Sequence, residues 1–141
     1  MMVLKCSSSA ASIGDLVGKG GGALFLAPSA VKTKKELKFA FYLAQEAFRT
    51  KENISKKPAN EAVLFLACET NFTSAAKKIG ARSARDFVLV SQKKIPLARL
   101  KKELLLTSAK PLKLPEWGRK RGHYSEGELA VEKMALARIR N

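Results

Sequence analysis

The stretch TKKELKFAFYLAQEAF, residues 33–48, carries the strongest local signal in the chain. Thr33 and Glu36 form a capping-box pattern, in which the threonine caps a helix start and the glutamate reaches back to it. Apolar residues then recur at helical spacing, and three more widen the apolar face. They are Leu37, Ala40, Phe41, Ala44 and Phe48, flanked by Phe39, Tyr42 and Leu43. The pattern predicts a helix that is buried on two sides.

Weaker signals on both sides of this stretch predict the other elements. Apolar and β-branched runs predict short strands over 3–4, 23–26 and 87–90. Apolar periodicity predicts helices over 59–68, 73–79 and 95–106, and a Pro- and Lys-rich connection then runs to residue 120. The glycines between the first two strands lack the spacing and the hydroxyl of a phosphate-binding loop, so we expect a turn there.

The last helix is expected to begin after a second capping box, Ser125 with Glu128, and to run to about Ile139. Its apolar residues lie nearly all round the helix axis, which fits either a central position in the fold or a bound partner. If Leu129 and Leu136 face the core, the opposite side carries a stripe suited to a partner protein. That stripe consists of Val131, Met134, Ala135 and Arg138.

Length and charge limit the class of protein. A chain of 141 residues predicts a single domain with a core of its own. The mean hydropathy of −0.12 is that of a soluble globular protein, and no apolar run approaches the roughly 20 residues of a membrane helix. There are 27 Lys and Arg against 12 Asp and Glu, a net charge of +15, which favours a polyanionic partner.

The residues that usually carry chemistry are scarce. Cys6 and Cys68 make neither a disulfide framework nor a zinc site, and His123 is the only histidine. The carboxylates, among them Glu69 and Asp86, show no paired spacing suited to acid–base catalysis. We therefore expect no enzyme, no metal and no cofactor, in the reducing environment of the cytoplasm.

Several stretches, in this order and spacing, resemble the small non-catalytic subunit of the KEOPS complex, the family of the PRPK-binding protein. They begin with residues 33–37, Ala47-Phe48-Arg49 and Asn53-Ile54-Ser55-Lys56. They continue through residues 60–67, 75–81 and 131–136. The resemblance runs from about Val3 to the C-terminus and is weakest over 93–124.

The resemblance implies an α+β fold: one domain over residues 1–141, with a small, mainly antiparallel sheet packed with helices. It also implies a role without catalysis in threonylcarbamoyladenosine modification of tRNA. Subunits of this family dock on the small atypical kinase/ATPase subunit and capture the single-stranded 3′ CCA end of tRNA. The chain departs from the family at residues 67–72, which replace its small-Gly-x-Arg-Gln-Ile pattern with a stretch one residue shorter that lacks the glycine and the arginine.

The candidate RNA-binding residues follow from these matches and from the basic helix starts. They are Lys34, Lys35, Asn53, Thr70, Asn71, Phe72, Lys77 and Lys78. Phe72 is either a platform on which a base stacks or an ordinary core residue. The alternative function is a free-standing basic RNA-binding protein, for example a ribosome-associated one, without a kinase partner.

Overall fold

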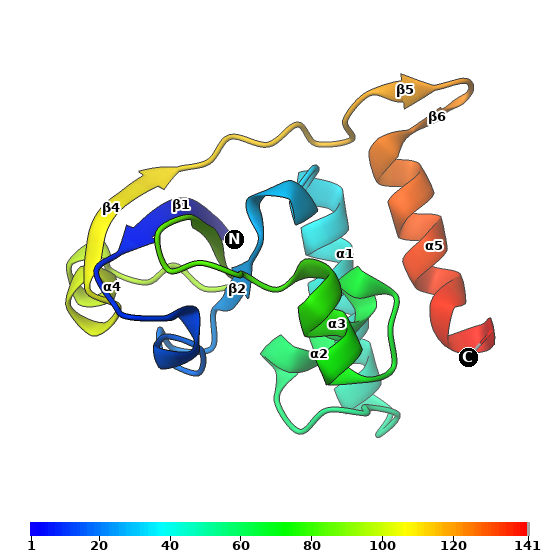
Figure 1. Cartoon of the computed structure of the whole chain (residues 1–141). Coiled ribbons are helices and arrows are strands. Elements are labelled where there is room, and N and C mark those ends of the chain that lie inside the picture. Colours follow the sequence, from blue (N-terminus) through cyan, green and yellow to red (C-terminus); the bar gives the residue numbers. More distant parts are fainter. Residues whose placement is uncertain (141) are drawn as a thin grey trace. The chain divides into compact units, whose positions relative to one another are not determined.

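The computed structural model describes residues 1–140, except for the side chains of Arg121 and of residues 138–140. The chain forms two compact units (Figure 1). Unit 1 combines Met1–Val31 with Gly80–Lys113, and unit 2 combines Lys32–Ile79 with Leu114–Asn141. Neither unit is one continuous segment, and the single domain predicted from the length stays a prediction.

Unit 1 is built on a four-stranded antiparallel sheet with the strand order β2-β3-β1-β4. The strands are β1 (Met2–Ser8), β2 (Leu24–Leu26), β3 (Phe87–Ser91) and β4 (Leu106–Pro111). The sheet and the helices together confirm the expected α+β class with a small antiparallel sheet.

The core of unit 1 covers one face of this sheet. Leu4 and Cys6 of β1 alternate inward and meet Phe87 and Leu89 of β3, as the two-residue period of a strand requires. The short helix α4 (Leu97–Glu103) adds Leu100, which is fully buried in the same cluster. Two 3-10 turns complete the unit, at Ile13–Asp15 and Pro28–Ala30.

Unit 2 is mainly helical. It contains α1 (Lys34–Arg49), α2 (Pro58–Ala67), α3 (Phe72–Ile79), α5 (Glu126–Arg140) and a hairpin of β5 (Lys120–Arg121) with β6 (Tyr124–Ser125). Its core joins Ala40 and Ala47 of α1 to Phe65 of α2 and Met134 of α5. The helix predicted from residues 33–48 therefore supplies a face to both of the helices packed against it.

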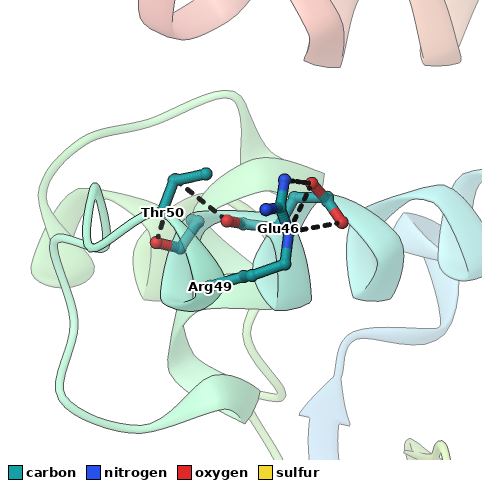
Figure 2. A network of polar contacts seen from close by, with 4 residues as sticks. Glu46, Arg49 and Thr50 are labelled. Carbon is teal, nitrogen blue, oxygen red and sulfur yellow. Dashed lines mark hydrogen bonds and ion pairs between the residues drawn. The ribbon is translucent and has the colours of Figure 1, made fainter.

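Helix α1 has well-defined ends. The capping box is confirmed: Thr33 N–H donates to Glu36 Oε2 at 3.0 Å, and Glu36 N–H donates to Thr33 Oγ1 at 3.3 Å. At the other end, Arg49 forms an ion pair with Glu46 at 2.6 Å, and the Thr50 hydroxyl donates to the Glu46 carbonyl at 3.0 Å (Figure 2). Side chains thus satisfy backbone groups at the start and at the end of α1.

Residues 115–119, which we call the strap, supply hydrogen bonds to the first turns of both α1 and α5. Lys34 N–H donates to the Pro115 carbonyl at 3.0 Å, and Lys35 N–H donates to the Glu116 carbonyl at 3.1 Å. In α5, Glu126 N–H donates to the Arg119 carbonyl at 2.8 Å and Gly127 N–H to the Trp117 carbonyl at 2.6 Å. These N–H groups would otherwise lack a partner, because no earlier helical carbonyl can reach them.

Two expectations differ from the structure. The connection predicted over 107–120 contains the edge strand β4, which alternates weakly because most of its side chains are exposed. In α5 the predicted orientation is wrong: Met134 is buried and Val131 packs beside it, whereas Leu129 is 40% exposed. The reason is that the faces of α1 and α2 select which apolar side of α5 is covered.

We predict that Gly127→Ala destabilises unit 2. A Cβ at this position would lie 2.9 Å from the Trp117 carbonyl oxygen and 3.1 Å from Trp117 Cα, both backbone atoms that cannot rotate away. We expect a loss of about 1–3 kcal/mol in the free energy of unfolding, despite the better helix propensity of alanine. Thermal melts should show no comparable loss for Gly14→Ala, where a Cβ meets only Ser12 Oγ at 3.6 Å. Equal stability of both variants would contradict close packing of the strap.

Candidate nucleic-acid interface

The lysines at the start of α1 have different surroundings. Lys34 is exposed at the first position of the helix. Lys35 Nζ lies 3.6 Å from Glu116 Oε1 and 5.1 Å from the centre of the Trp117 ring, in cation–π geometry. Lys38 Nζ also contacts Glu116 Oε1, at 3.2 Å. The hydrogen bond from Lys38 and the charges of Lys38 and Lys35 hold the pKa of the Glu116 carboxyl below its usual value. Lys35 therefore has a structural task in holding the strap, which the sequence did not indicate.

The turn between α2 and α3 gathers another group of the predicted residues. Cys68 ends α2 in the left-handed conformation, with φ of 56°, so the chain reverses direction there. Asn71 caps α3, since its Oδ1 accepts from Ser74 N–H at 3.1 Å. Phe72 follows as the first residue of α3 and is 40% exposed, so it is not an ordinary core residue. Thr70, two residues earlier, is exposed as well.

Both lysines of α3 are exposed. Lys78 Nζ donates to the Ala67 carbonyl at 2.9 Å and lies 3.8 Å from Glu69 Oε1, so it satisfies a carbonyl at the end of α2. Lys77 is exposed on the same helix. The structure thus places Thr70 and Phe72 at the surface of this turn and Lys77 at the surface of the last turn of α3, while Asn71 and Lys78 help to shape the α2–α3 turn.

Asn53 lies at the other end of α2. Its Nδ2 donates to the Ser55 carbonyl at 2.9 Å, within the loop that precedes the helix. Helix α2 has ten residues, which corresponds to a length of roughly 15 Å. The structure therefore does not place Asn53 at the turn that carries Phe72, and its visible task is to shape its own loop.

Glu61 is fully buried in the first turn of α2. Its carboxylate accepts from Ile54 N–H at 3.1 and 3.2 Å and from Ser55 N–H at 2.8 Å. A buried carboxylate that receives loop N–H groups satisfies donors that would otherwise be costly to bury. The role of Glu61 is therefore to hold the 53–55 loop onto α2.

The residues expected to meet a partner protein are divided between core and surface. Val131 and Met134 belong to the core of unit 2, so they do not form the expected stripe. Ala135 is exposed, and the Arg138 side chain lies outside the described residues. Among the described side chains of α5, Leu129 is the large apolar one that is exposed, and half-buried Leu136 lies on the same side of the helix.

Leu129 also lines a hollow of about 300 Å³ between α5 and the start of α1. Glu36 and Glu126 face this hollow together with Lys32 and Lys133. Burial raises the pKa of Glu36, and the nearby Glu126 carboxylate raises it further, against hydrogen bonds from Thr33 and the charge of Lys32. Both carboxylates lie beside lysines, so the hollow is not a strongly acidic site.

Trp117 is the surface residue that sequence reasoning missed. It is 41% exposed, and Lys35 lies over its ring. Exposed aromatic rings next to cations are the usual platform for unpaired bases. The available signal was its position, as the single tryptophan of the chain in a basic, proline-containing stretch.

The structure shows how the two thiols are held. Burial raises the pKa of Cys6 to about 11, and burial also raises that of Cys68, so both thiols are protonated at neutral pH. Over residues 1–140 no group of three His, Cys, Asp or Glu side chains is placed to hold a metal ion. In the same described part, no helix combines the length and the apolar character needed to cross a bilayer.

No protein-family model and no curated protein matches this chain. The structure offers two exposed aromatic rings, Phe72 at the α2–α3 turn and Trp117 on the strap, and Lys35 lies over the Trp117 ring. Such an arrangement can bind single-stranded nucleic acid.

We predict that Glu61→Ala lowers stability more than RNA affinity. The change leaves the Ile54 and Ser55 N–H groups without their acceptor, at a cost of about 1–3 kcal/mol in the free energy of unfolding. Glu61→Gln, which keeps one acceptor oxygen, should lose less in the same denaturant titration. A stable Glu61→Ala variant that no longer binds RNA would instead place the carboxylate in the binding site.

Proposed function

We propose that this chain is a non-catalytic RNA-binding accessory subunit that holds a single-stranded tRNA end. The observation that carries the proposal is the exposed Phe72 ring at the start of α3, in a protein with a net charge of +15. A base stacked on such a ring contributes about 1–3 kcal/mol to binding. The resemblance to the KEOPS small subunit supports the 3′ CCA end of tRNA as the ligand.

Charges around the turn support a phosphate-rich ligand. Lys77 is exposed on the helix that begins with Phe72, and Thr70 is exposed two residues before the ring. Phosphate contacts from lysines position a strand without reading its sequence, whereas stacking holds the base. This division of tasks suits the same short, unpaired end on many different tRNAs.

The second part of the proposal is a protein partner, the kinase/ATPase subunit of KEOPS, in the cytoplasm. Support comes from the side of α5 that faces away from its core residues, where exposed Leu129 and half-buried Leu136 lie seven residues apart. A free-standing RNA binder has no need for exposed leucines on a helix. The partner surface thus moves from the stripe expected from the sequence to the opposite side of α5.

We predict that Phe72→Ala weakens the binding of intact tRNA by about tenfold. The reason is the loss of one stacked base, which corresponds to a free energy of roughly 1.4 kcal/mol. Electrophoretic mobility shifts with intact tRNA, and with tRNA lacking its 3′ CCA, would measure the effect. Removing the CCA should weaken binding to the unmodified protein and leave little further loss for the variant.

Tyr42→Ala is the matched control, because Tyr42 is 54% exposed on α1 and stacks on Phe39 with centroids 6.0 Å apart. It should bind tRNA as the unmodified protein does. Equal losses in the two variants would show that aromatic content, and not the α2–α3 turn, governs binding. Unchanged binding of CCA-less tRNA to the unmodified protein would contradict recognition of the 3′ end.

We predict that Leu129→Arg abolishes capture of the kinase subunit and leaves the protein folded. Leu129 is 40% exposed, so the arginine costs the isolated chain little, whereas at a desolvated interface an unpaired charge is expensive. Pull-down of the purified kinase, together with a thermal melt, would measure both effects. Met134→Arg should fail in both, since Met134 is buried, and normal kinase capture by Leu129→Arg would place the interface elsewhere.

A further inference from the structure

Strand β4 has a free edge with an unusual pattern of backbone groups. It is the outer strand of the sheet beside β1 (Figure 1). Leu112 N–H donates to the Val3 carbonyl at 3.0 Å. In an antiparallel pair the backbone groups of successive residues point alternately toward the neighbouring strand and away from it. The backbone groups of Lys110 therefore point toward β1, and those of Ala109 and Pro111 point outward. Pro111 has no N–H to offer, but Ala109 presents both a donor and an acceptor to an added strand.

An apolar hollow lies on one face of the sheet at this edge. It has a volume of about 380 Å³ and is lined by Met2, Leu4, Ile95, Leu97, Ala109 and Pro111, with Lys94 also lining it. Ala109 and Pro111 belong to β4, so a residue added opposite Ala109 would point its side chain toward the hollow. The walls favour an aliphatic side chain.

The opposite face of the same edge carries two like charges. Lys5 of β1 and Lys110 of β4 are direct cross-strand partners, and both are exposed. Like charges in this arrangement repel and destabilise the strand pair. An acidic residue on an added strand would lie next to Lys110 and relieve the repulsion.

Charge and lining together select the occupant. A second copy of this chain paired through β4 would bring its own lysines against Lys5 and Lys110. A nucleobase in the hollow would lose hydrogen bonds along its polar edges, because Lys94 is the single charged residue of the lining. An extended peptide with alternating acidic and aliphatic residues meets both requirements, since neighbouring residues of a strand face opposite sides.

We infer that the β4 edge is a docking site for an extended acidic segment of a partner protein, which adds as a fifth strand. The backbone pairs with Ala109, an aliphatic side chain enters the hollow, and its acidic neighbours lie beside Lys110. The site lies wholly in unit 1. It is independent of the RNA-binding turn proposed above.

The test uses the full chain and a fluorescein-labelled peptide with the core Glu-Leu-Glu-Leu-Glu, followed by fluorescence anisotropy. The unmodified protein should bind this peptide at least about tenfold more tightly than Glu-Ser-Glu-Ser-Glu, which has the same charge and no aliphatic anchor. Ala109→Pro removes the outward donor and keeps the pairing with β1, so it should weaken binding by about tenfold.

Charge reversal provides a second variant that does not depend on the backbone. Lys5→Glu with Lys110→Glu should lose the acidic peptide and gain Lys-Leu-Lys-Leu-Lys, while Lys19→Glu, in the loop before the opposite edge strand β2, should bind as the unmodified protein does. Equal binding of the leucine and serine peptides would overturn the proposal. Displacement by an octauridine at equal concentration would assign the edge to RNA, and concentration-dependent dimers in sedimentation would assign it to a second copy.

Discussion

Both long helices of unit 2 depend on the strap for the hydrogen bonds of their first turns. Its carbonyls accept from Lys34 and Lys35 at the start of α1 and from Glu126 and Gly127 at the start of α5. Helix N-termini normally attract anions, because their N–H groups point outward without partners. In unit 2, carbonyl oxygens of the strap already accept hydrogen bonds from these N–H groups of α1 and α5. An anionic ligand would therefore be bound by side chains around these helices.

The strap also decides what the lysines of α1 can do. Glu116 lies against Lys35 and Lys38, and Trp117 lies under Lys35. Exposed ion pairs of this kind contribute little to stability, but they hold side chains in one place. In the same way Lys78 is turned toward the end of α2 by the Ala67 carbonyl. The net charge of +15 thus overstates the number of cations that face a ligand.

Polar residues near α2 separate into two roles by their hydrogen bonds. The side chains of Glu61 and Asn53 form hydrogen bonds with the backbone of one loop, and Glu61 is fully buried. At the other end of α2, Asn71 caps α3 and leaves Phe72 at the surface. A rigid turn that holds an exposed ring is preorganised for stacking, because the ring need not be extracted from the core before it binds.

Local patterns determined much of the fold and of the candidate site. The capping box of Thr33 and Glu36, the periodicity after it, and the apolar run of β3 are signals within a few residues, so they could be predicted. Strand β4 could not, because it pairs with β1 across roughly a hundred residues of sequence and exposes most of its side chains. The apolar residues of α5 lie nearly all round its axis, so only packing against α1 and α2 decided that Met134 lies inside and Leu129 outside. The exposure of Phe72 and the contacts of Lys35 were likewise decided by tertiary structure, since both depend on neighbours that are distant along the chain.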